Sequence, residues 1–516
     1  MKPRRVGPLV AAAVLLALAA QGAERTDEIV VAFGAEPQQV DPTRSSAGVD
    51  GYYMDLFYEN LLAVTPDFER VNWLAESWEV VDDADGLRIA VKIREGVTFH
   101  NGDELTAHDY AYAFERQSDP TSRTAGRLRH VDGVRVHDDY RFDMVLGSPD
   151  GSLEPLNLIL ATIPRKYYEE VGDDGVQVHP IGTGPWKFVS RKVREELVVE
   201  RFEDYWNRDA MPVAKRLRIK IIPEDTTRVA AFKTGAVDWI DAVPPAQVEE
   251  FEATPGVRVA SLPAPNNLYV ALNAIDAGSP FRFPKVRQAA AHAVNVDDIV
   301  QYVLYGQGIR TAQLAPGTLG YDPALKPYPY DPARARELLA EAGYPAGVNV
   351  NCYNLTTPRE PYFKEVGETI FAYLTEAGIR CRIVQLEYGA WINLGRRDVR
   401  PHMDGIMSTM WGQGLPGDPT DAWSGHVHTT GDGWGSYSYE STPQLDAMIE
   451  TLRTTMDLET RTRLIEEIAR LKHELVAGGL PTYRPMITLA WREGVDFDPW
   501  PAAFWRSMRG LRGAEP

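Results

Sequence analysis

The sequence predicts an α/β protein with more than one domain. The chain has 516 residues, which is enough for two or three domains with full cores. Short apolar strands alternate with amphipathic helices along most of this length. In one unit, a strand at 348–354, a helix at 361–377 and a strand at 379–386 follow one another closely, and this order forms a right-handed parallel crossover.

The first 23 residues have the pattern of a secretory signal peptide. A basic end and a short apolar run precede small residues that permit cleavage, namely Lys2, Arg4, Arg5, 9–20, Ala17, Ala19 and Ala23. The run is too short for a membrane span. The Arg4-Arg5 pair hints at twin-arginine export, but the residues after it fit poorly, so we favour the general route. No cysteine lies near the cleavage region, so we expect a periplasmic protein without a lipid anchor.

The charge balance excludes two classes of partner. The formal net charge is −19, and it becomes −22 without the three basic residues of the signal. Such a surface repels nucleic acid and anionic lipid, so we expect neither as a partner. Most of the 12 tryptophans and 23 tyrosines fit ordinary packing, and a few of them fit the lining of a ligand cleft.

The two cysteines, Cys352 and Cys381, fall in the two strands of the crossover unit, which would make them neighbours. An exported protein permits a disulfide, and two buried free thiols are the equal alternative. They cannot build a zinc site alone, because no histidine lies beside them at ligand spacing.

The stretch 74–109 predicts a β-hairpin followed by a helix. Strands at 77–81 and 87–93 flank a turn of aspartates and Gly86, where side-chain hydrogen bonds and a free φ favour chain reversal. An Asn-Gly turn ends the second strand region. Thr106 and Asp109 have the spacing of a capping box, which predicts that a helix begins there.

The remaining elements follow from hydrophobic periodicity and from capping residues. We expect strands at 29–33, 216–222, 237–240, 268–273 and 405–411, and two strands within 131–146. We expect helices at 52–62, 156–163, 226–234, 442–453 and 458–476, and helices that begin at Pro164, Asn295 and Asp331. The tail at 481–505 is expected to return to the first domain.

Several of these stretches carry motifs of one protein family. They are Leu74-Ala75-x-Ser77-Trp78, Arg94-x-Gly96-Val97-x-Phe99-His100-x-Gly102, Gly182-Thr183-Gly184-Pro185-Trp186, Val286-Arg287-Gln288-Ala289 and Tyr330-Asp331-Pro332. Together they resemble the family-five extracellular solute-binding proteins, the peptide, dipeptide and nickel receptors of bacterial ABC importers. A phosphate-binding loop is excluded at Gly182-x-Gly184, because a strand follows and no lysine-serine pair does. We expect these glycines to let the backbone cross between domains.

The resemblance implies a class II periplasmic-binding-protein fold with two main lobes, a hinge and a small extra α+β domain. The discontinuous first lobe would take 27–53, 181–273 and 481–512, the extra domain 54–180, and the second lobe 274–480. The ligand would be enclosed as the lobes hinge together. The resemblance also implies a monomer that docks on the permease subunits of an ABC transporter and needs no cofactor or metal.

Candidate ligand residues also come from the resemblance. The loop at 36–42 resembles the family's first loop, which reaches the ligand cleft, and it contains Gln38. Tyr269 and Asn273 lie in the strand that enters the hinge region. Ordinary strand packing is the alternative role for both.

The segment from Trp411 to Pro419 is the most informative loop. In peptide receptors of the family, a tryptophan leads into a loop with an aspartate that holds the amino terminus of the peptide. This chain keeps Trp411 and Asp418-Pro419, and Gln413 is a further candidate ligand residue in the loop, but no acidic residue lies between Trp411 and Asp418. Asp418 either takes over the anchoring role or caps the helix after Pro419. The missing anchor favours, as an alternative ligand, an oligosaccharide, an opine-like conjugate or a metal chelate.

Two further groups have open interpretations. Trp434, followed by two tyrosines, fits stacking on a sugar or an aromatic ligand, or packing at the domain edge. His426 and His428 have a spacing that can share a metal ion, but a third ligand is missing from the sequence, so two loop histidines are favoured.

An enzyme is disfavoured. The sequence has no Gly-x-Ser-x-Gly elbow, and Ala477 stands where a zinc helix beginning at His473 needs its second histidine. We therefore predict a non-catalytic receptor that captures a peptide or peptide-like solute for an ABC importer. A sensory binding protein and a secreted hydrolase are the alternatives from other classes.

Overall fold

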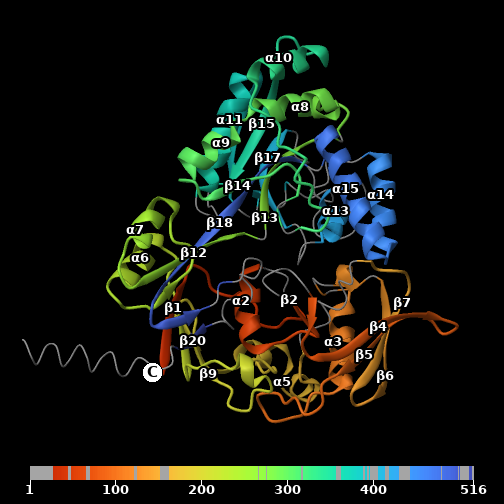
Figure 1. Cartoon of the computed structure of the whole chain (residues 1–516), viewed down its shortest axis with the longest axis vertical. Helices are drawn as coiled ribbons and strands as arrows, with labels where there is room; N and C mark the ends of the chain where they lie inside the picture. The colour runs from red at the N-terminus through yellow and green to blue at the C-terminus, as the bar shows by residue number, and fades with distance from the viewer. Residues whose placement is uncertain are drawn as a thin grey trace, which may run out of the picture.

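The structure is a computed structural model of the chain. It describes residues 27–44, 48–64, 70–120, 122, 125–128, 130–151, 162–264, 266–274, 276–314, 316, 318–355, 362–387, 390–391, 394, 405–412, 418–428, 442–477, 479–497, 499 and 511–513. Figure 1 shows two lobes, one above the other. We call the part around β1 (Glu28–Phe33) the lower lobe and the part around β15 (Val348–Leu355) the upper lobe.

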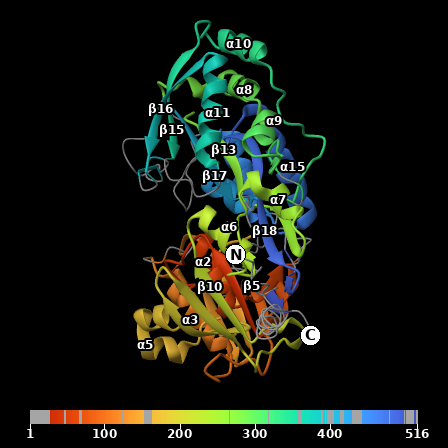
Figure 2. The same cartoon turned by 90° about the vertical axis from the view of Figure 1, so that its left-hand side faces the viewer.

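One twelve-stranded sheet passes through both lobes. Its order is β16-β15-β17-β13-β18-β11-β1-β10-β9-β8, with β12 and β14 pairing to β18 beside this path. The long strand β18 (Leu480–Arg492) pairs with β13 and β14 through its first half and with β12 and β11 through its second half. The sequence predicts that the tail at 481–505 returns to the first domain; within β18 only the second half does so, because the first half pairs with strands of the upper lobe. Figure 2 shows this strand running from the upper sheet down into the lower lobe.

The lower lobe is built on β1, whose apolar run EIVVAF is buried at most positions, as expected for a central strand. β1 pairs in parallel with β10 and β11, and β9 and β8 extend the sheet as an antiparallel edge. Its elements are α2 (Gly48–Phe57), β8 (Trp186–Lys192), β9 (Glu196–Arg201), β10 (Arg216–Ile221), α6 (Asp225–Lys233), β11 (Trp239–Ile240), α7 (Val248–Glu252), β12 (Val257–Pro263), β19 (Val495–Phe497) and β20 (Leu511–Gly513).

A separate four-stranded antiparallel sheet, in the order β4-β5-β7-β6, packs beside this lobe with its own buried core. The predicted hairpin and helix are confirmed here. Thr106 and Asp109 form the expected capping box at the start of α3. The elements are β2 (Leu62–Val64), β3 (Arg70–Asn72), β4 (Ala75–Asp83), β5 (Gly86–Ile93), α3 (Ala107–Ser118), β6 (Val131–Asp138), β7 (Arg141–Leu146) and α5 (Arg165–Val178). The helix expected at 156–163 lies almost entirely outside the described residues.

The upper lobe contains the predicted crossover. β15 pairs in parallel with β16 and β17, and α11 packs over the pair. Cys352 and Cys381 form a disulfide between β15 and β16, which settles the two alternatives for these residues. The elements are β13 (Asn266–Leu272), α8 (Pro284–Ala293), α9 (Val296–Asp298), β14 (Gly308–Arg310), α10 (Pro332–Glu341), α11 (Phe363–Glu376), β16 (Ile379–Leu386), β17 (Ile406–Gly412), α13 (Thr420–His426), α14 (Pro443–Thr454) and α15 (Leu458–Leu475).

The helix expected at 52–62 ends earlier, at Phe57. The chain leaves the helix and buries Glu59 completely. The Glu59 carboxylate accepts hydrogen bonds from Trp73 Nε1 at 2.8 Å, Tyr205 Oη at 2.7 Å and Trp206 Nε1 at 2.9 Å. A buried carboxylate requires such donors, and this requirement outweighs the local helical periodicity.

Candidate functional site

Two segments of chain connect the lobes, and the candidate site is the region around them. β12 leads into β13 between Pro263 and Asn266, and β18 passes in the opposite direction beside it. The two segments are joined by a hydrogen bond from Ala264 N to Pro485 O at 2.8 Å. Few main-chain connections of this kind are enough to let two lobes rotate about a shared axis.

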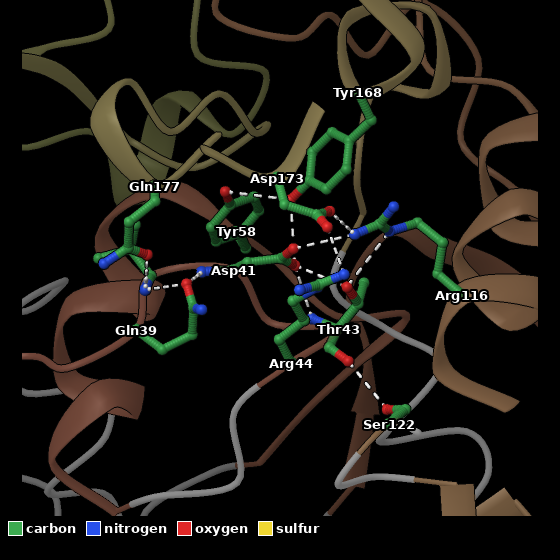
Figure 3. A network of polar contacts seen from close by, with 11 residues as sticks. Gln39, Asp41, Thr43, Arg44, Tyr58, Arg116, Ser122, Tyr168, Asp173 and Gln177 are labelled. Atoms are coloured by element: carbon green, nitrogen blue, oxygen red, sulfur yellow. Dashed lines mark hydrogen bonds and ion pairs between the residues drawn. The ribbon is translucent and has the colours of Figure 1, made fainter. Parts of the chain in front are cut away.

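Below this junction lies the loop that follows β1, which includes Gln38. Figure 3 shows that its second half is centred on Asp41. The Asp41 carboxylate, which is 1% exposed, accepts hydrogen bonds from Thr43 N at 2.9 Å and Thr43 Oγ1 at 2.7 Å. Arg116 Nη2 on α3 lies 3.2 Å from it and 2.6 Å from Asp173 on α5. The loop is therefore fastened to two helices of the extra domain.

Two tyrosines complete this cluster. The hydroxyl groups of Tyr58 and Tyr168 lie 3.4 Å apart, and Tyr168 Oη also donates to Asp41 at 3.4 Å. Burial, and after it the charge of Asp41 and its neighbours, raises the pKa of both tyrosines above the ordinary value. Both hydroxyls thus stay protonated. The Tyr168 hydroxyl donates to the buried Asp41 carboxylate, and the Tyr58 hydroxyl lies against that of Tyr168.

The first half of the loop is held as firmly. Arg191 Nη2 on β8 lies 2.9 Å from Glu36 Oε1 and donates to Pro37 O at 2.8 Å. Gln38 donates its main-chain N–H to Asp50 Oδ1 at 2.8 Å, and its carbonyl accepts from Gln177 Nε2. The Gln38 side chain is exposed. A rigid backbone that presents an exposed amide side chain is a suitable platform for a ligand.

Tyr269 and Asn273 lie on β13 and directly after it, in the upper lobe. Tyr269 is buried, and its hydroxyl donates to Gln313 O at 2.8 Å. Asn273 is fully buried, and its side chain donates to Asp276 Oδ2 at 2.8 Å and accepts from Asp276 N at 3.2 Å. In this conformation the polar atoms of both side chains contact other residues of the upper lobe.

The loop from Trp411 to Asp418 begins at the lower end of the upper sheet. Trp411 belongs to β17 and pairs with Asn267 of β13, so its backbone lies beside the junction of the lobes. Gln413 and Trp434 lie outside the described residues.

Asp418 ends the loop. Its carboxylate accepts from Thr420 N at 2.9 Å and Thr420 Oγ1 at 2.6 Å, and it forms an ion pair with Arg461 Nη2 at 2.5 Å. Of the two roles that the sequence leaves open, this geometry favours the capping role. Arg461 is 2% exposed and lies on α15, 43 positions along the chain. Its role had no signal in the sequence, because it occupies one of several charged positions on an amphipathic helix.

The lobes also meet away from the connecting strands. Gly151 of the extra domain donates its N–H to Arg453 O at 2.9 Å, at the end of α14. Arg453 Nη2 lies 3.2 Å from His130 Nε2. A Cβ added at Gly151 would lie 1.9 Å from Thr455 O and from the Arg461 guanidinium, so only glycine permits this approach. We call this contact the rim contact.

His428 contacts a carboxylate on α14. Its Nε2 lies 3.1 Å from Glu450 Oε1, and within the described ranges no three histidine, cysteine or acidic side chains are grouped as a metal site. Nor does any described helix combine the length and apolar character that crossing a bilayer requires.

The Gly182-Thr183-Gly184 motif has a structural explanation. His100 Nε2 lies 2.8 Å from Gly184 O, and Gly182 N donates to His100 Nδ1 at 3.3 Å. A Cβ at Gly182 would lie 2.1 Å from Phe57 O, at the end of α2. The glycines thus let the chain pass close to a helix end, and His100 ties the hairpin of the extra domain to them.

The comparisons with known proteins agree with this architecture. Residues 69–434 match the family described as bacterial extracellular solute-binding proteins, family 5 Middle. The glutathione-binding protein GsiB of Pectobacterium atrosepticum is 27% identical over 389 residues, which cover 74% of this chain and 73% of the relative.

Solved structures show the same fold. The periplasmic binding protein DppA of Helicobacter pylori, in complex with the peptide STSA, superposes with a TM-score of 0.81 at 23% identity, covering 96% of this chain and 100% of that one. AgaA of A. tumefaciens R10, in complex with agropinic acid, has a TM-score of 0.78 at 21% identity, with 95% and 99% coverage. The chain described here belongs to the family 5 extracellular solute-binding proteins of bacteria.

Proposed function

We propose that this protein captures a peptide or peptide-like solute between its two lobes and delivers it to the permease of an ABC importer. The observation that supports this proposal is that the chain belongs to family 5 and holds in place two structured elements that the resemblance assigns to the ligand. These are the anchored loop with Gln38 from the lower lobe and the ends of β13 and β17 from the upper lobe. Two similar proteins support the solute class: GsiB is named for binding glutathione, and DppA was solved in complex with the peptide STSA.

The proposed lobes are those of the sequence analysis, with 27–53, 181–273 and 481–512 in the first, 274–480 in the second, and 54–180 as the extra domain. We place Gln38, Tyr269, Asn273, Trp411, Gln413 and Trp434 around the ligand, with Asp418 holding the end of the loop. Tyr269 and Asn273 would then affect ligand binding by fixing the conformation of the upper lobe near the ligand, because their polar atoms form hydrogen bonds with other residues of that lobe. The receptor would act as a monomer in the periplasm, without a lipid anchor, and it would catalyse no reaction.

Native mass spectrometry of protein purified from its own periplasm tests this proposal. A retained mass that is released on denaturation and fragments as a peptide is the expected result. If the retained mass is that of a sugar or a metal chelate, the ligand is not a peptide. The lack of an acidic residue before Asp418 in the loop would then accompany a changed ligand specificity.

A second candidate ligand is an opine-like conjugate. AgaA, which has the same fold, was solved with agropinic acid, and this chain lacks the expected amino-terminus anchor before Asp418. Binding assays with peptides and with opines in parallel would separate the two. Turnover of a peptide or glycoside panel would instead support the hydrolase alternative.

A further inference from the structure

Arg484 is the side chain from which we infer a property of the ligand. It lies in the middle of β18, where this strand passes between the lobes, and it is 6% exposed. Its Nε donates to Ala264 O in the connecting segment, and its Nη1 lies 3.5 Å from Pro316 O. Both partners are neutral main-chain carbonyl groups.

The positive charges of the other buried arginines among the described residues are compensated by nearby negative groups. Arg228 contacts Asp225 at 2.7 Å and Asp241 at 3.0 Å, Arg453 contacts Glu450 at 3.1 Å, and Arg461 contacts Asp418 at 2.5 Å. The fourth, Arg287, donates to the carbonyls of Leu475 and Val476 at the end of α15, where the helix dipole is negative. Each of these four charges is compensated.

Arg484 is the exception. Among the described residues, no carboxylate pairs with it, and neither of its carbonyl partners, Ala264 and Pro316, belongs to a helix. Burial lowers its pKa from 12.5 to about 10, with no opposing effect of a neighbouring acid. A guanidinium keeps its charge at neutral pH even so, and a buried charge without a counter-ion is costly. Such a cost is tolerated where a charged partner arrives with a ligand.

Two other buried polar atoms at neighbouring positions have no hydrogen-bond partner among the residues that the structure describes. Asn267 is fully buried, its Oδ1 accepts from no group, and it precedes Leu268, which pairs with Tyr483 of β18. The hydroxyl of Thr311 is likewise unbonded, and Thr311 N donates to Thr482 O, two residues from Arg484. Asn267 also pairs with Trp411 at the start of the proposed ligand loop.

We propose that Arg484 binds a carboxylate of the ligand, and that Asn267 accepts a hydrogen bond from an adjacent N–H of the same ligand. This inference rests on the proposed function and narrows it to solutes that carry a free carboxylate beside an amide or amine, as the carboxyl end of a peptide does. A guanidinium binds a carboxylate through two parallel hydrogen bonds, which gives orientation as well as affinity.

The test compares two libraries of tripeptides, one with free carboxyl ends and one with carboxamide ends. Dissociation constants are measured by native mass spectrometry for the wild type, Arg484→Met and Arg310→Met. The last variant is the control, because Arg310 lies on the neighbouring strand β14 and its charge is already paired with Asp297. A charge-assisted hydrogen bond predicts that the wild type prefers the free acids by about 10- to 100-fold.

Arg484→Met should lose this preference and bind acids and amides alike, while Arg310→Met keeps it. Arg484→Lys retains the charge without the planar fork and should keep part of the preference, which covers the case in which the methionine variant folds poorly. If Arg484→Met weakens both libraries equally, Arg484 only supports the fold and the inference is wrong. If the wild type binds both libraries equally, the inference fails and the proposed function stands. If the wild type binds neither, the proposed function fails and the inference with it.

Discussion

His100 should make this protein lose stability in mildly acidic solution. The side chain is 8% exposed and lies between Gly182 N and Gly184 O, which fixes a neutral ring with the proton on Nε2. Burial lowers the pKa of His100 from 6.5 to about 3, and the hydrogen bond to Gly184 O opposes this only in part. The folded state therefore binds the proton more weakly than the unfolded state does.

The sign and size follow from that difference. The stability contributed by the neutral ring is complete above the unfolded pKa of 6.5, and it is lost as the pH falls toward the folded value of about 3. Each pH unit within this window costs about 1.4 kcal/mol, so a change from pH 6.5 to about pH 4.5 should remove about 2–3 kcal/mol.

Urea denaturation at a series of pH values measures this effect as a difference between the wild type and His100→Gln. The variant keeps a donor for Gly184 O but loses the titrating ring. At neutral pH it should be less stable by about 1–3 kcal/mol, and the gap should close as the pH falls. His108→Gln is the control, because the His108 side chain is 54% exposed. Curves for wild type and His100→Gln that run parallel from neutral pH to about pH 4.5 would refute the reasoning.

Three further substitutions should alter stability or ligand binding. Gly182→Ala would place a Cβ 2.1 Å from a carbonyl at the end of α2 and should cost about 1–3 kcal/mol in urea denaturation, whereas Gly133→Ala, with open space around it, should cost little. Cys352→Ser removes a disulfide that spans 29 positions, and the free energy of unfolding should fall by about 3–4 kcal/mol; an unchanged urea midpoint would contradict this. Gly151→Ala should disrupt the rim contact and weaken ligand binding about 5- to 100-fold in calorimetry, with unaltered affinity as the contrary result.

Local structure could be predicted from the sequence where neighbouring residues decide it. The strand at 379–386 has the observed bounds, and the capping box at Thr106 begins a helix as expected. The helix expected to reach Leu62 was wrong at its end, because Glu59 finds three donors that come from positions 73, 205 and 206. Hydrophobic periodicity carries no information on such distant partners.

In the candidate site, too, the sequence predicts local features but not the contacts between distant residues. The resemblance predicts that the loop at 36–42 contacts the ligand, but it gives no indication of the residues of α3 and α5 that anchor this loop. Asp418 had two possible roles in the sequence, and the choice between them depends on Arg461, which nothing local connects to it. Arg484 also has no sequence signal, because its distinguishing feature is three-dimensional: no carboxylate among the described residues pairs with it.

The position of β18 in the sheet has a consequence for protein synthesis. The strand that joins the two halves of the sheet is synthesised after the other eleven strands of that sheet, while β1, on the far side of β11 from it, is synthesised before them. Until residues 480–492 emerge, β11 and β13 each have an open edge, and open edges pair readily with other chains. A nascent chain of this protein thus stays incomplete in both halves of the sheet until β18 emerges, and a stop codon shortly before Leu480 would leave two unfinished sheets in place of one.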